Sequence, residues 1–153
     1  MKLSQISQNK EEKRTLVDDH SRMTSSEVEE RIIEATDQFD SVILVYLFGS
    51  FATGRSHRFS DVDVGIYFRQ FSLPEFLKVH GALSRALGTE VDTVPLNDAP
   101  PLLRYEILRN GKRLVSKDEM TRIVYESRAI VEGLDEKPLI EMIREANLRR
   151  VLG

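Results

Sequence analysis

The chain has 153 residues and a formal net charge of −3, with 31% charged and 41% hydrophobic residues. This size fits one domain with a proper core, and the mild acidity argues against direct binding of nucleic acid. The absence of cysteine excludes disulfides and thiolate metal sites, and no apolar run is long enough for a membrane span. We expect a cytoplasmic protein with a flexible tail over residues 1–25 and a single domain over residues 26–153.

The domain is predicted to begin with a helix and a buried strand. Ser26 with Glu29 forms a capping box, and the apolar positions that follow have helical spacing, so a helix is expected to about Gln38. The run SVILVYLF (41–48) is nearly all apolar and rich in β-branched and aromatic residues. Such a run is typical of a strand buried on both faces.

Strands and helices then alternate to the end of the chain. The run DVDVGIYF (61–68) predicts a second strand, and Pro74 and Gly88 mark the beginning and the end of the next helix. The other predicted elements are a strand over 90–96, a helix from Pro100-Pro101 to Asn110-Gly111, an edge strand over 112–116, a helix from Asp118 to about Glu132 and, after Gly133 and Pro138, a last helix. The fold class is therefore α+β, a small mixed β-sheet with helices packed against it.

The stretch GSFATGRSHRFSDVD, which begins at Gly49, contains the residues best suited to catalysis. A glycine lets the backbone approach a phosphate closely, and Ser50 adds a hydroxyl that can bond a phosphate oxygen. Asp61 and Asp63 are two residues apart on a strand and point to the same face. Two close carboxylates repel each other unless a cation lies between them, and oxygen ligands suit Mg²⁺ or Mn²⁺. The stretch predicts a site for a nucleoside triphosphate with Mg²⁺.

Asp92, in the strand after the next helix, is a third candidate carboxylate. Three carboxylates from adjacent strands could hold two cations, and Asp92 would bind the second or take a proton from the acceptor. Arg55, His57 and Arg58 lie between the Gly-Ser pair and the aspartates, where their charge could meet a leaving pyrophosphate. A polar surface loop explains these three residues equally well.

Three further residues have simpler structural interpretations. His80 lies on the apolar face of its helix and is expected to be a core or boundary histidine with its hydrogen bonds satisfied. Tyr105 and Tyr125 are expected to be packing residues, and the alternative is that either one stacks on a base.

At these positions the chain resembles the polymerase-beta-like nucleotidyltransferases, which have a Gly-Ser pair, a DxD pattern and a third acid on a later strand. The residues that match are Gly49, Ser50, Asp61, Asp63 and Asp92. The chain is also similar, over about residues 27–150, to minimal nucleotidyltransferases (MNT), specifically the MntA-type antitoxins of HEPN/MNT toxin–antitoxin systems. The stretches 91–119 and 134–140 support this likeness. Thr53 departs from an arginine common among these relatives, and Gly133 and Glu136 depart from aromatic residues.

The resemblance implies a polymerase-beta-like nucleotidyltransferase fold with C-terminal helices. It also implies transfer of AMP from ATP to a tyrosine hydroxyl of a cognate HEPN ribonuclease toxin, which neutralises the toxin within a hetero-oligomeric complex. Two Mg²⁺ ions would be held by the aspartates, and ATP would be the co-substrate, bound at Gly49, Ser50, Arg55 and Arg58.

Two alternatives remain open from the sequence. The first is a nucleotidyltransferase for a small molecule such as an aminoglycoside, which an acidic groove would support. The second is a non-catalytic MNT module that neutralises a toxin by binding alone. The presence of Asp61, Asp63 and Asp92 counts against the second alternative, because binding alone does not need three acids.

Overall fold

The computed structural model describes residues 23–52 and 61–152. Its elements are α2 (Ser25–Asp37), β1 (Val42–Phe48), the 3₁₀ turn η1 (Gly49–Phe51), β2 (Val62–Phe68), α3 (Leu73–Leu87), β3 (Val91–Pro95), α4 (Pro101–Asn110), β4 (Lys112–Ser116) and α5 (Glu119–Leu152). The predicted α+β class with a small mixed sheet is confirmed.

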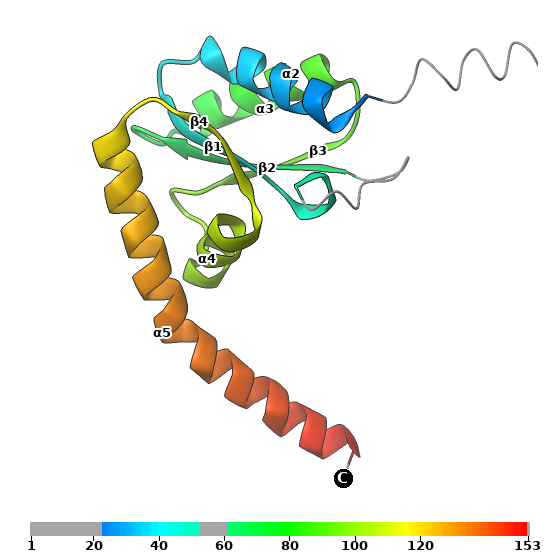
Figure 1. The fold of residues 1–153 in the computed structure, drawn as a ribbon, viewed down its shortest axis with the longest axis vertical. Coiled ribbons are helices and arrows are strands. Elements are labelled where there is room, and N and C mark those ends of the chain that lie inside the picture. The colour runs from blue at the N-terminus through cyan, green and yellow to red at the C-terminus, as the bar shows by residue number, and fades with distance from the viewer. Residues whose placement is uncertain (1–22, 53–60, 153) are drawn as a thin grey trace, which may run out of the picture.

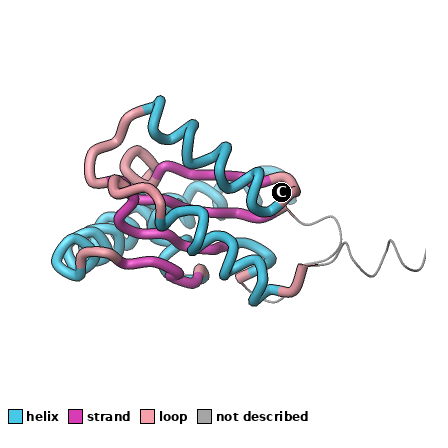
Figure 2. Tube along the Cα trace, turned by 90° about the horizontal axis from the view of Figure 1, so that it is seen from above, coloured by secondary structure: helices cyan, strands magenta, loops and turns pink. Residues whose placement is uncertain are grey.

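The strands within the described residues form one sheet in the order β3-β2-β1-β4. β1 is antiparallel to both β2 and β4, whereas β2 and β3 are parallel. A parallel pair needs a crossover connection, which α3 supplies between β2 and β3. Seen from above, two helices run obliquely along the strands (Figure 2). The register places Asp63 on β2 beside both Phe48 on β1 and Asp92 on β3.

The two faces of the sheet are covered by different helices (Figure 1). On the face of α2 and α3 the main core contains the alternate residues of β2, namely Val62, Val64, Ile66 and Phe68. On the other face, a second core unites β1 with α4 and α5 through Tyr46, Ile107 and Tyr125, among others. Because side chains alternate along a strand, Asp63 points to the α4/α5 face.

The predicted capping box at the start of the first helix was wrong by two residues. Thr24, not Ser26, is the N-cap: the Glu27 N–H donates to Thr24 Oγ1 (3.2 Å), and the Thr24 N–H donates to Glu27 Oε2 (2.8 Å). The same spacing of hydroxyl and glutamate occurs at both positions, and the earlier pair gives the longer helix. Met23 already packs against the main core. The domain therefore begins within the predicted tail, of which residues 1–22 lie outside the described residues.

The predicted break after Glu132 was also wrong, because α5 continues through Gly133 as a single helix. Gly133 is buried, and a Cβ atom there would lie 2.6 Å from Cγ of Tyr105 on α4. The glycine is thus needed for close packing of the two helices, and Tyr105 has the packing role expected of it.

The C-terminal part of α5 extends away from the sheet, and the helix changes direction along its length (Figure 1). Pro138 lies within this helix and has no N–H for the usual helical hydrogen bond, which is a common cause of such a bend. Residues 144–150 are exposed. Despite its length, α5 is not apolar enough to cross a membrane, nor is any other helix in the described part of the chain.

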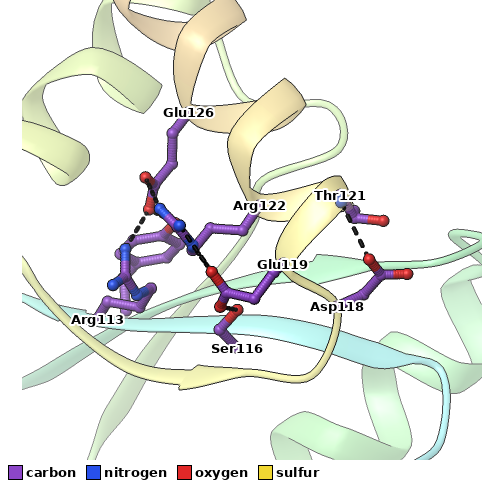
Figure 3. Close-up of polar contacts among 8 residues, drawn as sticks. Arg113, Ser116, Asp118, Glu119, Thr121, Arg122 and Glu126 are labelled. Carbon is purple, nitrogen blue, oxygen red and sulfur yellow. Dashed lines mark hydrogen bonds and ion pairs between the residues drawn. The ribbon is translucent and has the colours of Figure 1, made fainter.

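A network of charged side chains attaches the start of α5 to the sheet (Figure 3). Glu126 accepts hydrogen bonds from the Tyr46 hydroxyl (2.8 Å), from Arg113 (2.8 Å) and from Arg122 (3.0 Å). Partial burial raises the pKa of Glu126, but the hydrogen bonds from Tyr46 and Arg113 outweigh it and hold the pKa below its ordinary value. Glu126 is therefore charged and fully engaged, and it fixes α5 to both β1 and β4.

Two helix-interior glycines provide a matched test of the α4–α5 packing. At Gly81 in α3 an added Cβ meets only the flexible end of Arg85, at 3.3 Å. Gly81→Ala should therefore stabilise the fold by roughly 0.5–1 kcal/mol, because alanine is the better helix former. Gly133→Ala should destabilise it by about 1–3 kcal/mol through the overlap with Tyr105. Urea unfolding measures both, and an equal gain for the two variants would contradict the packing described.

Candidate active site

The end of β1 brings Gly49 against Asp63. Gly49 has a φ of +71°, in the left-handed region that favours glycine. A Cβ atom at this position would overlap the Asp63 carboxylate and lie 3.1 Å from Asp63 Cγ. Glycine is therefore required twice, for its backbone conformation and for the space that the carboxylate occupies. Ser50 follows in η1, half-buried.

The parallel pairing of β2 and β3 brings Asp63 and Asp92 together as register partners. Asp61 precedes β2 and is exposed, as is Asp92, whereas Asp63 is half-buried. Burial raises the pKa of Asp63 above its ordinary value, and the negative charges of Asp92 and Asp61 raise it further. The structure thus brings the three predicted carboxylates into electrostatic contact.

These carboxylates fit a divalent cation in their chemistry. Hard oxygen donors from three aspartates suit Mg²⁺, and a cation would remove the repulsion that now acts on Asp63. Within residues 23–52 and 61–152, no three acidic or histidine side chains already stand at ligand spacing around one point. Asp61 and Asp92 are exposed, and exposed side chains change rotamer readily, so a cation could draw them toward Asp63.

Other predicted residues lie away from this cluster or outside the described chain. Arg55, His57 and Arg58 fall within residues 53–60, which the structure does not describe, and so does Thr53. His80 Nδ1 lies 2.7 Å from Thr93 Oγ1, which confirms a boundary histidine with a hydrogen-bond partner.

A cavity that the sequence did not predict lies at the far end of β2. Its volume is about 380 Å³, and its lining comes from β2, the segment after β3, α4 and α5: Tyr67, Asn97, Arg104, Met120, Thr121, Val124, Tyr125 and Arg128. Asn97 exchanges two hydrogen bonds with the backbone of Phe68, each 2.9 Å long, and so holds this end of the strand. The ring centroids of Tyr67 and Tyr125 are 4.7 Å apart, so Tyr125 has the packing role expected of it.

Residues 30–120 match the family model described as polymerase beta, nucleotidyltransferase. This match covers more than half of the chain. The chain belongs to the polymerase beta nucleotidyltransferase family.

Proteins similar to this chain include components of toxin–antitoxin systems. Over 80 residues, 51% of this chain, it is 34% identical to the protein adenylyltransferase MntA of Shewanella oneidensis; the match spans 57% of that relative. A solved toxin–antitoxin structure with AMP-PNP superposes with a TM-score of 0.62 at 25% identity, covering 82% of this chain and 98% of that one.

This chain also superposes on a chain of a solved structure that contains a tri-AMPylated Shewanella oneidensis HEPN toxin in complex with an MNT antitoxin. The TM-score is 0.59 at 21% identity. The match covers 85% of this chain and all of that chain. At this identity the comparison supports the nucleotidyltransferase fold alone.

A second pair of glycines tests the contact between Gly49 and Asp63. Gly88, which ends α3, also has a positive φ (61°), but an added Cβ there meets nothing within 4 Å. Gly88→Ala should cost about 1 kcal/mol of stability, from backbone strain alone. Gly49→Ala should cost more and should also weaken Mg²⁺-ATP binding at least about tenfold, since it displaces the Asp63 carboxylate. Thermal unfolding and calorimetric titration measure the two effects, and equal behaviour of the variants would refute the contact.

Proposed function

We propose that this nucleotidyltransferase is an antitoxin that transfers AMP from ATP to a tyrosine hydroxyl of a cognate HEPN ribonuclease toxin. The observation that carries the proposal is the convergence of Gly49, Asp63 and Asp92 at one edge of the sheet. The relative that is named a protein adenylyltransferase supports the choice of AMP and of a protein acceptor. The chain would act in the cytoplasm, where ATP is available.

The chain's own residues have distinct parts in this proposal. The bare backbone at Gly49 would let the triphosphate lie close to the carboxylates, and Ser50 would donate its hydroxyl hydrogen to a phosphate oxygen. Arg55 and Arg58 are proposed to meet the leaving pyrophosphate. Asp61, Asp63 and Asp92 would hold Mg²⁺, two ions in the full arrangement, which when bound neutralises the charge of the triphosphate.

The transfer is a substitution at the α-phosphorus of ATP. The tyrosine oxygen forms a bond to this phosphorus, the bond to the bridging oxygen of the β-phosphate breaks, and pyrophosphate leaves. A tyrosine hydroxyl has a pKa of about 10, so a base must accept its proton at neutral pH. Asp92, whose carboxylate is exposed beside Asp63, is proposed either to bind the second Mg²⁺ or to accept this proton.

The exposure of the carboxylates favours an acceptor on another protein. Asp61 and Asp92 are both accessible from outside the domain, and the cavity lined by Tyr67 and Tyr125 does not include them. A small acceptor would need walls around the reacting atoms to hold it in position. A tyrosine on a docked partner is instead held in position by the contacts between the two proteins.

The test is the intact mass of the partner. This chain is co-expressed with the product of its adjacent gene, and ATP and Mg²⁺ are added. We expect a gain of one or more AMP units. Asp63→Asn should slow the gain at least about 100-fold without loss of stability, because it removes a ligand and also a repelled, half-buried charge.

Asp37→Asn is the matched control, since Asp37 is an exposed aspartate at the end of α2, and it should transfer AMP at the parent rate. A stable complex without any mass gain would indicate neutralisation by binding. If the partner gained AMP at the parent rate with the Asp63→Asn variant, the proposed site would be refuted.

A further inference from the structure

The outward face of α5 carries a continuous apolar stripe that nothing in the described chain covers. Six large side chains make up the stripe: Met120, Ile123, Val124, Ile130, Val131 and Leu134. They are between 40% and 70% exposed, with Met120 at 70% and Val131 at 60%. An exposed apolar patch of this extent, in contrast to scattered single residues, is typical of an interaction surface.

The stripe is distinct from the face of α5 that packs against the domain. The residues of α5 that pack on the domain, Tyr125, Ala129 and Gly133, are four apart and lie on the opposite side of the helix. Both sides of α5 are therefore apolar, although the domain needs only one of them. An apolar side that is exposed to water indicates that α5 has a second contact surface.

The spacing of the stripe fits a helix as its occupant. Met120, Val124, Val131 and Leu134, with Ser127 between them, follow steps of four, three, four and three residues. This seven-residue repeat keeps one seam facing a neighbouring helix over its whole length. Ile123 and Ile130 widen the seam on one side.

The charge beside the stripe indicates what else the occupant carries. Met120 and Val124 also line the cavity at the far end of β2, whose lining includes Arg104 and Arg128 and no carboxylate. Glu132 forms long ion pairs with both arginines, 3.8 Å from Arg104 and 4.0 Å from Arg128, so one carboxylate faces two positive charges. The cavity therefore suits an acidic side chain from a helix lying on the stripe.

A second copy of this chain fits the surface poorly. The antiparallel pairing that best matches the apolar residues is centred on Ser127, with Met120 opposite Leu134, and it brings the two Arg128 side chains together. In a parallel pairing the residue of the second helix that flanks Arg128 across the seam would be Ile123, which is not an acid. Neither arrangement gives Arg128 a free carboxylate.

We propose that the α5 stripe and the adjoining arginine cavity form the docking surface for a helix of the partner protein, which carries an apolar seam and an acidic residue directed at Arg104 and Arg128. The partner is the HEPN toxin of the proposed function, on which this inference rests. The surface lies away from Asp63, so docking and catalysis use different residues.

Affinity for a candidate partner, the product of the adjacent gene, tests the docking surface. All variants are made in the Asp63→Asn background, so that no modification alters binding during the titration. Val131→Asp and Arg128→Glu should each weaken binding at least about tenfold. Leu77→Asp and Lys78→Glu are matched controls on exposed positions of α3 and should bind as the parent does. All four sites are exposed, and thermal unfolding confirms that each variant is folded.

Parent-like affinity of Val131→Asp would overturn the proposal, and so would the absence of a complex with the parent. A dimer of this chain alone, converted to a monomer by Val131→Asp, would overturn it in favour of a second copy. Loss of binding in Val131→Asp without any AMP transfer by the wild-type chain would support the surface and refute the proposed reaction. AMP transfer with unchanged binding of Val131→Asp would refute the surface alone.

Discussion

At the candidate active site, the fold holds the carboxylates of Asp63 and Asp92 close together although they repel each other. The parallel register of β2 and β3 places Asp63 beside Asp92, and the left-handed turn at Gly49 closes over the Asp63 carboxylate. Burial and the neighbouring charges make the ionised form of Asp63 unfavourable. Such an arrangement does not favour folding by itself, and a bound cation of the kind proposed would compensate for it.

The two faces of the sheet explain how this strain is tolerated. The face of α2 and α3 is a conventional apolar core, which holds β2 through every second residue. The carboxylates point to the other face, where α4 and α5 are anchored by Tyr46 and Glu126. Both faces therefore hold β1 and β2 in place, and the candidate carboxylates lie at the end of the α4/α5 face.

Patterns within a few residues were readable from the sequence. The apolar run of β1, the Gly49-Ser50 pair and the alternation around Asp61 and Asp63 each depend on neighbours in the chain. The strands could therefore be located, and candidate site residues could be named. Asp92 could be named as a candidate because most of its neighbours in the strand are apolar.

Ambiguous local patterns and features set by distant residues could not be predicted. The start of α2 could not be located because the capping spacing occurs twice within a few residues. Gly133 could end a helix or allow close packing, and the choice depends on Tyr105 in a different helix. The cavity of Arg104 and Arg128 draws its lining from several elements. No local pattern brings those residues together.

The most direct measurement follows the phosphorus atom. The partner toxin and this chain are incubated with Mg²⁺ and ATP labelled either at the α- or at the γ-phosphorus. A site built from Gly49, Asp63 and Asp92 for nucleotidyl transfer predicts label on the toxin from α-labelled ATP and none from γ-labelled ATP. Label from the γ-phosphorus, or no label within a stable complex, would contradict the account.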